Sequence, residues 1–174
     1  MTAARLQSLG GQLIRPEMCA FSVYIDNQFD TFAAGTANTP VPYSTKGTKL
    51  FDRNNDYDLT NNKFTAPVTG LYQFNFKLRI ENATTGEYIV SVLMEPGYTG
   101  NGGAGSLNAS RSTADIIYAQ TYNILIAQAY NTNEANALLY LTSGQEITHA
   151  ARVQSDNSVR LSDRGCAFQG FFVG

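Results

Sequence analysis

The chain has 174 residues, a formal net charge of −2 and a charged fraction of 15%. A chain of this length is long enough to form one domain that buries most of its apolar surface. Because it contains no run of like charges, the sequence argues against a nucleic-acid partner, which would require a basic patch or stripe. No apolar stretch reaches the roughly 20 residues that cross a bilayer, so we expect no membrane partner either.

Residues 1–19 are predicted to form an N-terminal arm, and residues 20–174 a single domain. The apolar residues of the arm fall on one side of a short helix, but Gly10 and Gly11 interrupt that helix. Such an arm is not expected to remain free in water, so we expect it to dock on a neighbouring copy or on another protein. The candidate anchoring residues are Leu6, Leu9, Leu13 and Ile14.

The start of the chain lacks the apolar core of about 7–15 residues that a secretion signal contains. Polar residues such as Arg5, Gln12 and Arg15 are spread through this segment instead. If Met1 is the natural start, we expect the chain to be made in a cytoplasm and to reach the exterior by lysis. The alternative is a chain from which a signal segment or a stalk has been removed.

The first predicted strand covers residues 21–32, with a bend at Asp26 and Asn27. Residues 33–42 are rich in Gly, Thr, Asn and Pro, which predicts a loop. Residues 54–62 are polar and predict a turn, after which Phe64 begins the next strand.

Residues 72–80 carry the clearest pattern in the chain, because large apolar side chains alternate there with polar ones. The two sets are Tyr72, Phe74, Phe76, Leu78 and Ile80 on one side, and Gln73, Asn75, Lys77 and Arg79 on the other. Successive side chains of an extended strand point to opposite faces. The alternation therefore predicts one long strand with a buried aromatic face, whereas a helix would scatter the polar groups around its circumference.

Several strands are predicted after this one. They cover residues 88–94, 115–119, 122–130, 136–141, 145–153 and a closing segment at 168–172. The run at 88–94 is apolar on both sides, which predicts cover on both faces. We expect residues 131–134 to turn the chain and residues 155–165 to form a polar loop.

A set of short motifs resembles the globular head of complement C1q. The motifs are Tyr57-Asp58, residues 64–67, Gly70-Leu71-Tyr72 with Phe74, residues 141–147 and residues 168–172. Gln145 departs from the pattern, since the family commonly has an aspartate there. The resemblance spans about residues 20–173 and suggests a phage or bacterial member of the family that shares its fold with the tumour necrosis factor ligands. It implies an all-β, ten-stranded, two-sheet antiparallel jelly-roll sandwich that assembles as a homotrimer.

Large apolar side chains fall on both faces of the closing strand and of residues 122–130. A half-exposed antiparallel strand should be apolar on one face only. We therefore expect one face to pack in the sandwich core and the other to meet two further copies of the chain, as in an obligate interface. The candidate trimer-interface residues are Tyr72, Phe74, Tyr122, Ile124, Phe171 and Val173.

Two cysteines, Cys19 and Cys166, stand at the starting ends of the first and the last predicted strand. The topology implied by the resemblance makes these strands antiparallel neighbours, so their starting ends lie far apart. A disulfide requires Cα atoms within roughly 7 Å of each other. We expect two free, buried thiols.

Few residues suggest catalysis or metal binding. His149, the only histidine, shares a predicted strand face with apolar neighbours, which favours a structural role over that of a general base. Asp52, Asp56 and Asp58 are expected to be solvated turn residues, with calcium binding as the alternative. The glycine-rich segment 100–106 lacks the residues of a phosphate-binding loop. We predict a protein that is not an enzyme and binds no cofactor or metal.

The expected function is that of a homotrimeric capsid decoration, or cement, protein of a phage. The arm would anchor it to a major capsid protein or another virion component, and the protein would be located in the virion. The alternative is a receptor- or carbohydrate-binding tip of a tail fibre or surface filament, located outside the cell or on its surface.

Overall fold

The computed structural model describes residues 19–27, 29–32, 38–82, 88–96, 117–124, 130–154 and 159–174. These residues form thirteen strands and one short helix, α2 (Tyr43–Lys46). The strands are β1 (Ala20–Ile25), β2 (Phe29–Phe32), β3 (Thr39–Pro40), β4 (Gly47–Asp52), β5 (Tyr57–Asp58), β6 (Lys63–Thr65), β7 (Gly70–Glu81), β8 (Tyr88–Met94), β9 (Ile117–Ile124), β10 (Asn131–Leu141), β11 (Glu146–Gln154), β12 (Val159–Leu161) and β13 (Ala167–Phe172).

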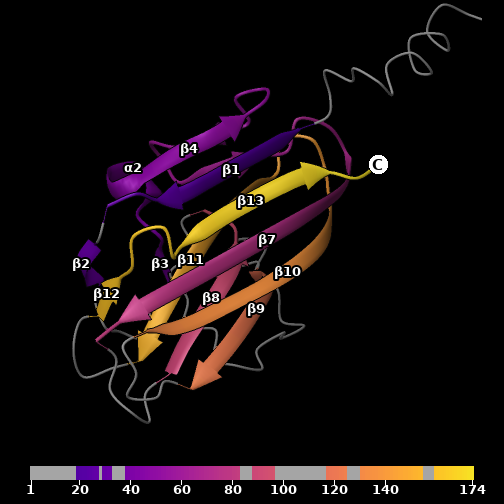
Figure 1. The fold of residues 1–174 in the computed structure, drawn as a ribbon. Helices are drawn as coiled ribbons and strands as arrows, with labels where there is room; N and C mark the ends of the chain where they lie inside the picture. Colours follow the sequence, from indigo (N-terminus) through magenta and orange to yellow (C-terminus); the bar gives the residue numbers. More distant parts are fainter. Residues whose placement is uncertain are drawn as a thin grey trace, which may run out of the picture.

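The strands form two sheets that pack face to face (Figure 1). Sheet A has the order β2-β12-β7-β13-β1-β4, and β10 pairs along β7. Sheet B has the order β5-β6-β11-β8-β9, and β3 also pairs with β11. All pairs that join these strands are antiparallel. The predicted two-sheet antiparallel sandwich is confirmed, although short strands at the margins raise the expected ten strands to thirteen.

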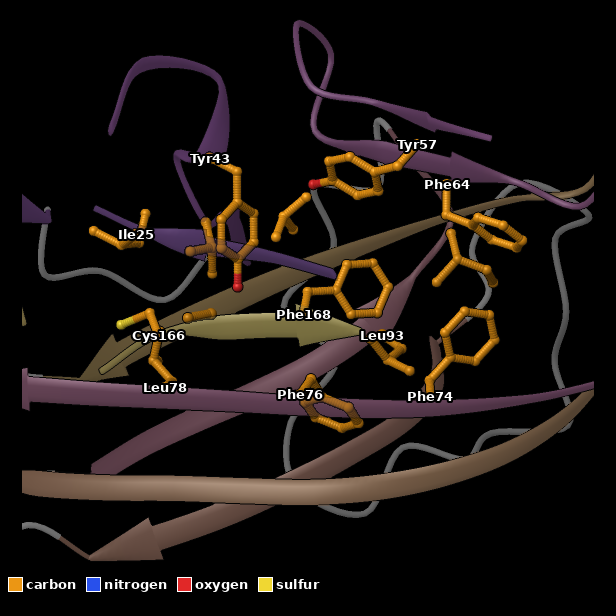
Figure 2. Close-up of a cluster of buried hydrophobic side chains, with 14 of the residues drawn as sticks. Ile25, Tyr43, Tyr57, Phe64, Phe74, Phe76, Leu78, Leu93, Cys166 and Phe168 are labelled. Atoms are coloured by element: carbon orange, nitrogen blue, oxygen red, sulfur yellow. The ribbon is translucent and has the colours of Figure 1, made fainter. Parts of the chain in front are cut away.

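The long alternating strand is confirmed as β7, in which buried and partly exposed residues alternate along almost its whole length. Its inner side chains enter a core of aromatic rings that come from both sheets (Figure 2). Phe21 of β1 stacks on Tyr57 and Phe64 at centroid distances of 5.0 and 5.1 Å. Phe74 of β7 meets Phe64 at 5.5 Å. Ring contacts of this kind stabilise a core beyond the burial of their area.

The apolar run of β8 is buried on both faces, as predicted. Ile89 and Leu93 join the main core between the sheets. Val90, Val92 and Met94 point to the opposite side and are also buried, in a second cluster with Ala150 of β11. From Ile89 to Met94, this strand therefore has no exposed apolar side chain.

Three predicted boundaries are wrong. β9 runs through the expected break between residues 119 and 122, residues 131–134 begin β10 instead of turning the chain, and β12 lies inside the predicted loop at 155–165. The second error has a clear cause, because the asparagines there are buried and bonded. Nδ2 of Asn133 donates to the carbonyl oxygens of Ile89 and Thr121, at 3.4 and 3.2 Å, and so ties β10 to sheet B.

The two cysteines are free and buried, as predicted. Their separation follows from the pairing of β1 with β13. The amide of Phe172 donates to the carbonyl oxygen of Cys19, and the amide of Ile25 donates to that of Cys166, both at 2.9 Å. Each cysteine therefore faces the far end of the other's strand.

Candidate assembly surface

The outer face of sheet A is organised in rows that cross its neighbouring strands. On β7, residues with odd numbers point outward, since those with even numbers are buried in the core. Leu71 pairs with Tyr140 of β10, and its backbone also bonds to residues 173 and 174. In the next row, Gln73 lies between Leu138 of β10 and Phe171 of β13.

These first two rows expose large apolar side chains. We call them the apolar band, which consists of Leu71, Leu138, Tyr140, Phe171 and Val173. Tyr140 is 67% exposed and Leu138 is 58% exposed, although both lie on β10, which carries core residues on its other face. Contiguous exposed apolar surface of this kind marks an interaction site in soluble proteins.

The band has a counterpart at the opposite edge of sheet A, on β4. Leu50 and Phe51 are 64% and 53% exposed. The register between β1 and β4 shifts after Ser22, which pairs with Phe51, whereas Val23 pairs with Lys49. Leu50 is thus the extra residue of a β-bulge, a feature that redirects side chains at sheet edges. Among the large apolar residues that the structure describes as exposed, all but Tyr130 belong to the band or to this pair.

Farther along the same face, the side chains are polar. Asn75 of β7 pairs with Asn136 of β10 on one side and with Gln169 of β13 on the other. The following row contains Lys77 and Glu134, whose charged groups are 3.7 Å apart. The outer face therefore has an apolar half and a polar half, and the polar half includes a hollow of about 380 Å³.

The structure places the predicted trimer-interface residues in different environments. Phe171 and Val173 lie in the apolar band. Tyr72 and Phe74 are fully buried between the sheets, which corrects their assignment: they occupy the inner face of β7 (Figure 2 shows Phe74). Their outward neighbours, including Leu71, were missed.

Two further candidates belong to the other sheet. Tyr122 and Ile124 lie on β9, where they pair with Val90 and Tyr88 of β8. Their side chains fall outside what the structure describes, and so do the arm residues Leu6, Leu9, Leu13 and Ile14. Leu138 and Tyr140 were also missed, although their alternation with Leu139 and Leu141 places apolar groups on both faces of β10, which is the signal that was used for the closing strand.

His149 is buried inside the sandwich, in agreement with its predicted structural role. Its Nδ1 lies 2.8 Å from the hydroxyl of Tyr43, and its Nε2 lies 2.8 Å from Oγ of Ser91. Burial lowers the pKa of the imidazole to about 3, so the ring is neutral and has one N–H to donate. Although a serine and a histidine stand in contact, both are fully buried, and a substrate cannot reach them.

The acidic loop residues hold turns in place. The carboxylate of Asp52 accepts hydrogen bonds from the amides of Asp56 and Tyr57 and from the ammonium of Lys49. Asp58 accepts from the side chain and the backbone of Asn61, which lowers the pKa of its carboxyl group. Within the described ranges, no group of three or more His, Cys, Asp and Glu side chains is arranged to hold a metal ion. None of the helices in those ranges is long and apolar enough to cross a membrane.

Comparison with known proteins finds similarity in solved structures, while no family model and no curated protein matches. The globular domain of zebrafish complement 1qA is 19% identical, with a TM-score of 0.59, over 90% of this chain and 98% of that one. Murine APRIL is 13% identical, with a TM-score of 0.59, over 90% and 99% of the two chains. Eiger TNF from S. frugiperda is 12% identical, with a TM-score of 0.57, over 90% and 93%. The fold is a tumour necrosis factor/C1q-like jelly roll.

Proposed function

We propose that this chain is a non-enzymatic structural protein that assembles as a homotrimer through the outer face of sheet A and decorates the capsid of a phage. The observation that carries the proposal is the apolar band. Leu71, Leu138, Tyr140, Phe171 and Val173 are exposed together on one half of one sheet, whereas β8 of the other sheet is covered on both faces.

We expect a second copy of the chain to bury the apolar band. Burial of apolar area stabilises an association by roughly 25 cal/mol per Å² before the costs of ordering are subtracted. The band begins at β10, one edge of the row of strands, and the pair of Leu50 and Phe51 lies on β4 at the opposite edge. Contacts between two different edges are heterologous, and heterologous contacts form a ring when the rotation between neighbouring copies closes. The resemblance to the C1q head favours a ring of three.

The capsid role is the finer part of the proposal, and it rests on the arm. Trimerisation would present three arms at once, so that three weak contacts add up to a strong attachment. The first strand follows the arm directly, and the carbonyl of Cys19 bonds to Phe172 at the end of the closing strand. The proposed partner of the arm is a major capsid protein or another virion component.

The experiment compares the full chain with a variant that lacks residues 1–18. Phage particles purified from the source culture are stripped of the protein, incubated with each variant and sedimented. We expect the full chain to sediment with the particles and the shortened variant to stay in the supernatant as an intact trimer. Attachment of the shortened variant would overturn the anchoring role, and a monomeric full chain would overturn the trimer.

The alternative function, a carbohydrate-binding tip of a tail fibre or surface filament, is favoured by one observation. The polar half of sheet A combines Asn75, Asn136 and Gln169 on three adjacent strands beside a hollow. If this function holds, particle attachment will not depend on the arm, and the ligand will bind to the polar half of the sheet.

A further inference from the structure

Polar side chains form a ladder across four strands on the outer face of sheet A. Asn136 of β10 pairs with Asn75 of β7, which pairs in turn with Gln169 of β13. Gln169 pairs with Ser22 of β1, and its Nε2 donates to the Ser22 hydroxyl at 3.1 Å. Directly paired side chains of an antiparallel sheet lie about 4.5–5.5 Å apart, so the three carboxamides can contact a single small molecule.

A hollow lies against this ladder. It has a volume of about 380 Å³ and is lined by the three carboxamides together with Phe76, Lys77, Glu134, Ala135 and Ala167. Ala167 stands where a long side chain would fill the space, since it pairs with Lys77 in the row next to the ladder. The volume lies at the lower end of the range of about 300–1,000 Å³ for small-molecule pockets.

The chemistry of the lining is neutral and rich in hydrogen-bonding groups. A carboxamide has two N–H donors and an acceptor oxygen, and one of the donors of Gln169 is already used by Ser22. The ammonium of Lys77 lies 3.7 Å from the carboxylate of Glu134, so the two charges offset each other. An anion such as phosphate would find a carboxylate beside the only cationic group that lines the hollow among the described residues, and a cation would find the ammonium.

We propose that this hollow binds a neutral saccharide unit. Adjacent hydroxyl groups of a sugar both donate and accept, which matches the paired carboxamides of Asn75, Asn136 and Gln169. The Ala167 methyl group offers apolar contact to the C–H groups of the ring. The geometry resembles that of a pocket in which a few convergent polar groups fix the orientation of a ligand.

The site goes beyond the proposed structural role, and it names the ligand class and the residues for the alternative, carbohydrate-binding function. The ladder occupies the outward row next to the one that holds Leu138 and Phe171 of the apolar band. The site uses residues of one protomer only. Loss of the trimer therefore does not by itself remove the site.

The test is saturation-transfer NMR on the full chain with glucose, galactose, mannose, N-acetylglucosamine and N-acetylgalactosamine, each at up to 50 mM. We expect at least one of these sugars to bind with a millimolar dissociation constant. Ala167→Leu, which fills the hollow without removing a polar group, is expected to weaken that binding at least tenfold. Asn136→Ala removes one rung of the ladder and is expected to weaken it to a similar extent, and Ala167→Ser serves as the matched control that keeps binding.

Three outcomes would overturn the proposal. The first is that none of the five sugars binds. The second is that Ala167→Leu and Asn136→Ala bind as the unchanged chain does, which would place the sugar elsewhere. The third is tighter binding of glucosamine or gluconate than of their neutral counterparts, which would make the site one for a charged ligand. Circular dichroism and sedimentation of each variant separate the loss of the site from loss of the fold or the trimer.

Discussion

Oγ of Ser91 on β8 lies 2.8 Å from Nε2 of His149 on β11, and both side chains are fully buried. The Tyr43 hydroxyl contacts the other ring nitrogen at 2.8 Å, so the imidazole joins α2 to two strands of sheet B. A neutral imidazole donates through one nitrogen and accepts through the other, and two hydroxyl partners satisfy both roles. A serine and a histidine in contact could act as a nucleophile and its base. Here both are buried, and their contact links parts of the core.

Acid is predicted to destabilise the domain through His149. Burial lowers the pKa of its imidazole to about 3, against an ordinary value of 6.5. Between these two pH values the imidazole is protonated in the unfolded chain and neutral in the folded chain. This contribution to stability is complete above pH 6.5 and is lost as the pH falls from 6.5 towards 3, by about 1.4 kcal/mol for each pH unit. Urea unfolding followed between pH 7.5 and 5 measures this slope.

The control for this prediction is His149→Phe, which cannot take up a proton. It should remove the slope between pH 6.5 and 5 while lowering stability at pH 7.5, because the hydroxyls of Tyr43 and Ser91 each lose a partner at a cost of about 1–3 kcal/mol. An unchanged slope in this variant would show that other groups cause the acid sensitivity.

Gly170→Ala is predicted to destabilise the core. A Cβ atom at this position would lie 2.6 Å from Cε1 of Phe21 and 2.8 Å from two ring carbons of Phe74. These rings are held from both sheets, so overpacking is expected to cost about 1–3 kcal/mol. Gly174→Ala is the control, since a Cβ there meets no atom within 4 Å. Equal free energies of unfolding for the two variants would contradict the packing around Gly170.

Leu138→Lys is predicted to dissociate the trimer and leave the domain folded. Leu138 is 58% exposed in one protomer, so a lysine there can keep its ammonium in water. An interface would bury that charge at a cost of several kcal/mol. Sedimentation velocity at micromolar concentration should show three 18.9 kDa chains associated in the unchanged protein and one in the variant. Thr60→Lys adds the same charge on an exposed turn and should remain trimeric. A trimer in both variants would exclude Leu138 from the interface.

The sequence predicted the strands best where the pattern is local, and the site less well. The alternation in β7 is a property of neighbouring residues, and it identified the strand and its buried face. The outward residues Leu138 and Tyr140 become an interaction surface only because β10 pairs with β7 and brings them beside Leu71, which depends on a pairing between distant segments. The error at Tyr72 and Phe74 has a similar cause. An apolar residue on a strand can belong to the core or to an interface. Which of the two it is depends on whether its face of the strand packs against the second sheet.

The preference of asparagine for turns also led to a wrong prediction at residues 131–134. Asn131 and Asn133 have the composition of a turn, yet both are buried in β10. The carbonyls that receive the Asn133 side chain come from β8 and β9, so no window of the sequence around residue 133 contains the reason for its placement. The polar ladder was not predicted for the same reason. Its residues are far apart in the sequence and become neighbours only when β10, β7 and β13 pair, as seen for Asn75, Asn136 and Gln169.

The thiols of Cys19 and Cys166 are predicted to be inert in the folded protein. Burial raises the pKa of both, that of Cys166 to about 12, so almost no thiolate exists at neutral pH. Because the thiolate is the reactive form, Ellman's reagent should label neither cysteine in the native state at pH 8 and both at once in guanidinium chloride. Rapid labelling of one cysteine without denaturant would contradict the prediction. It would show that the end of the β1–β13 pair that carries this cysteine unfolds locally. Repeating the measurement with Cys19→Ser and Cys166→Ser would then identify which end it is.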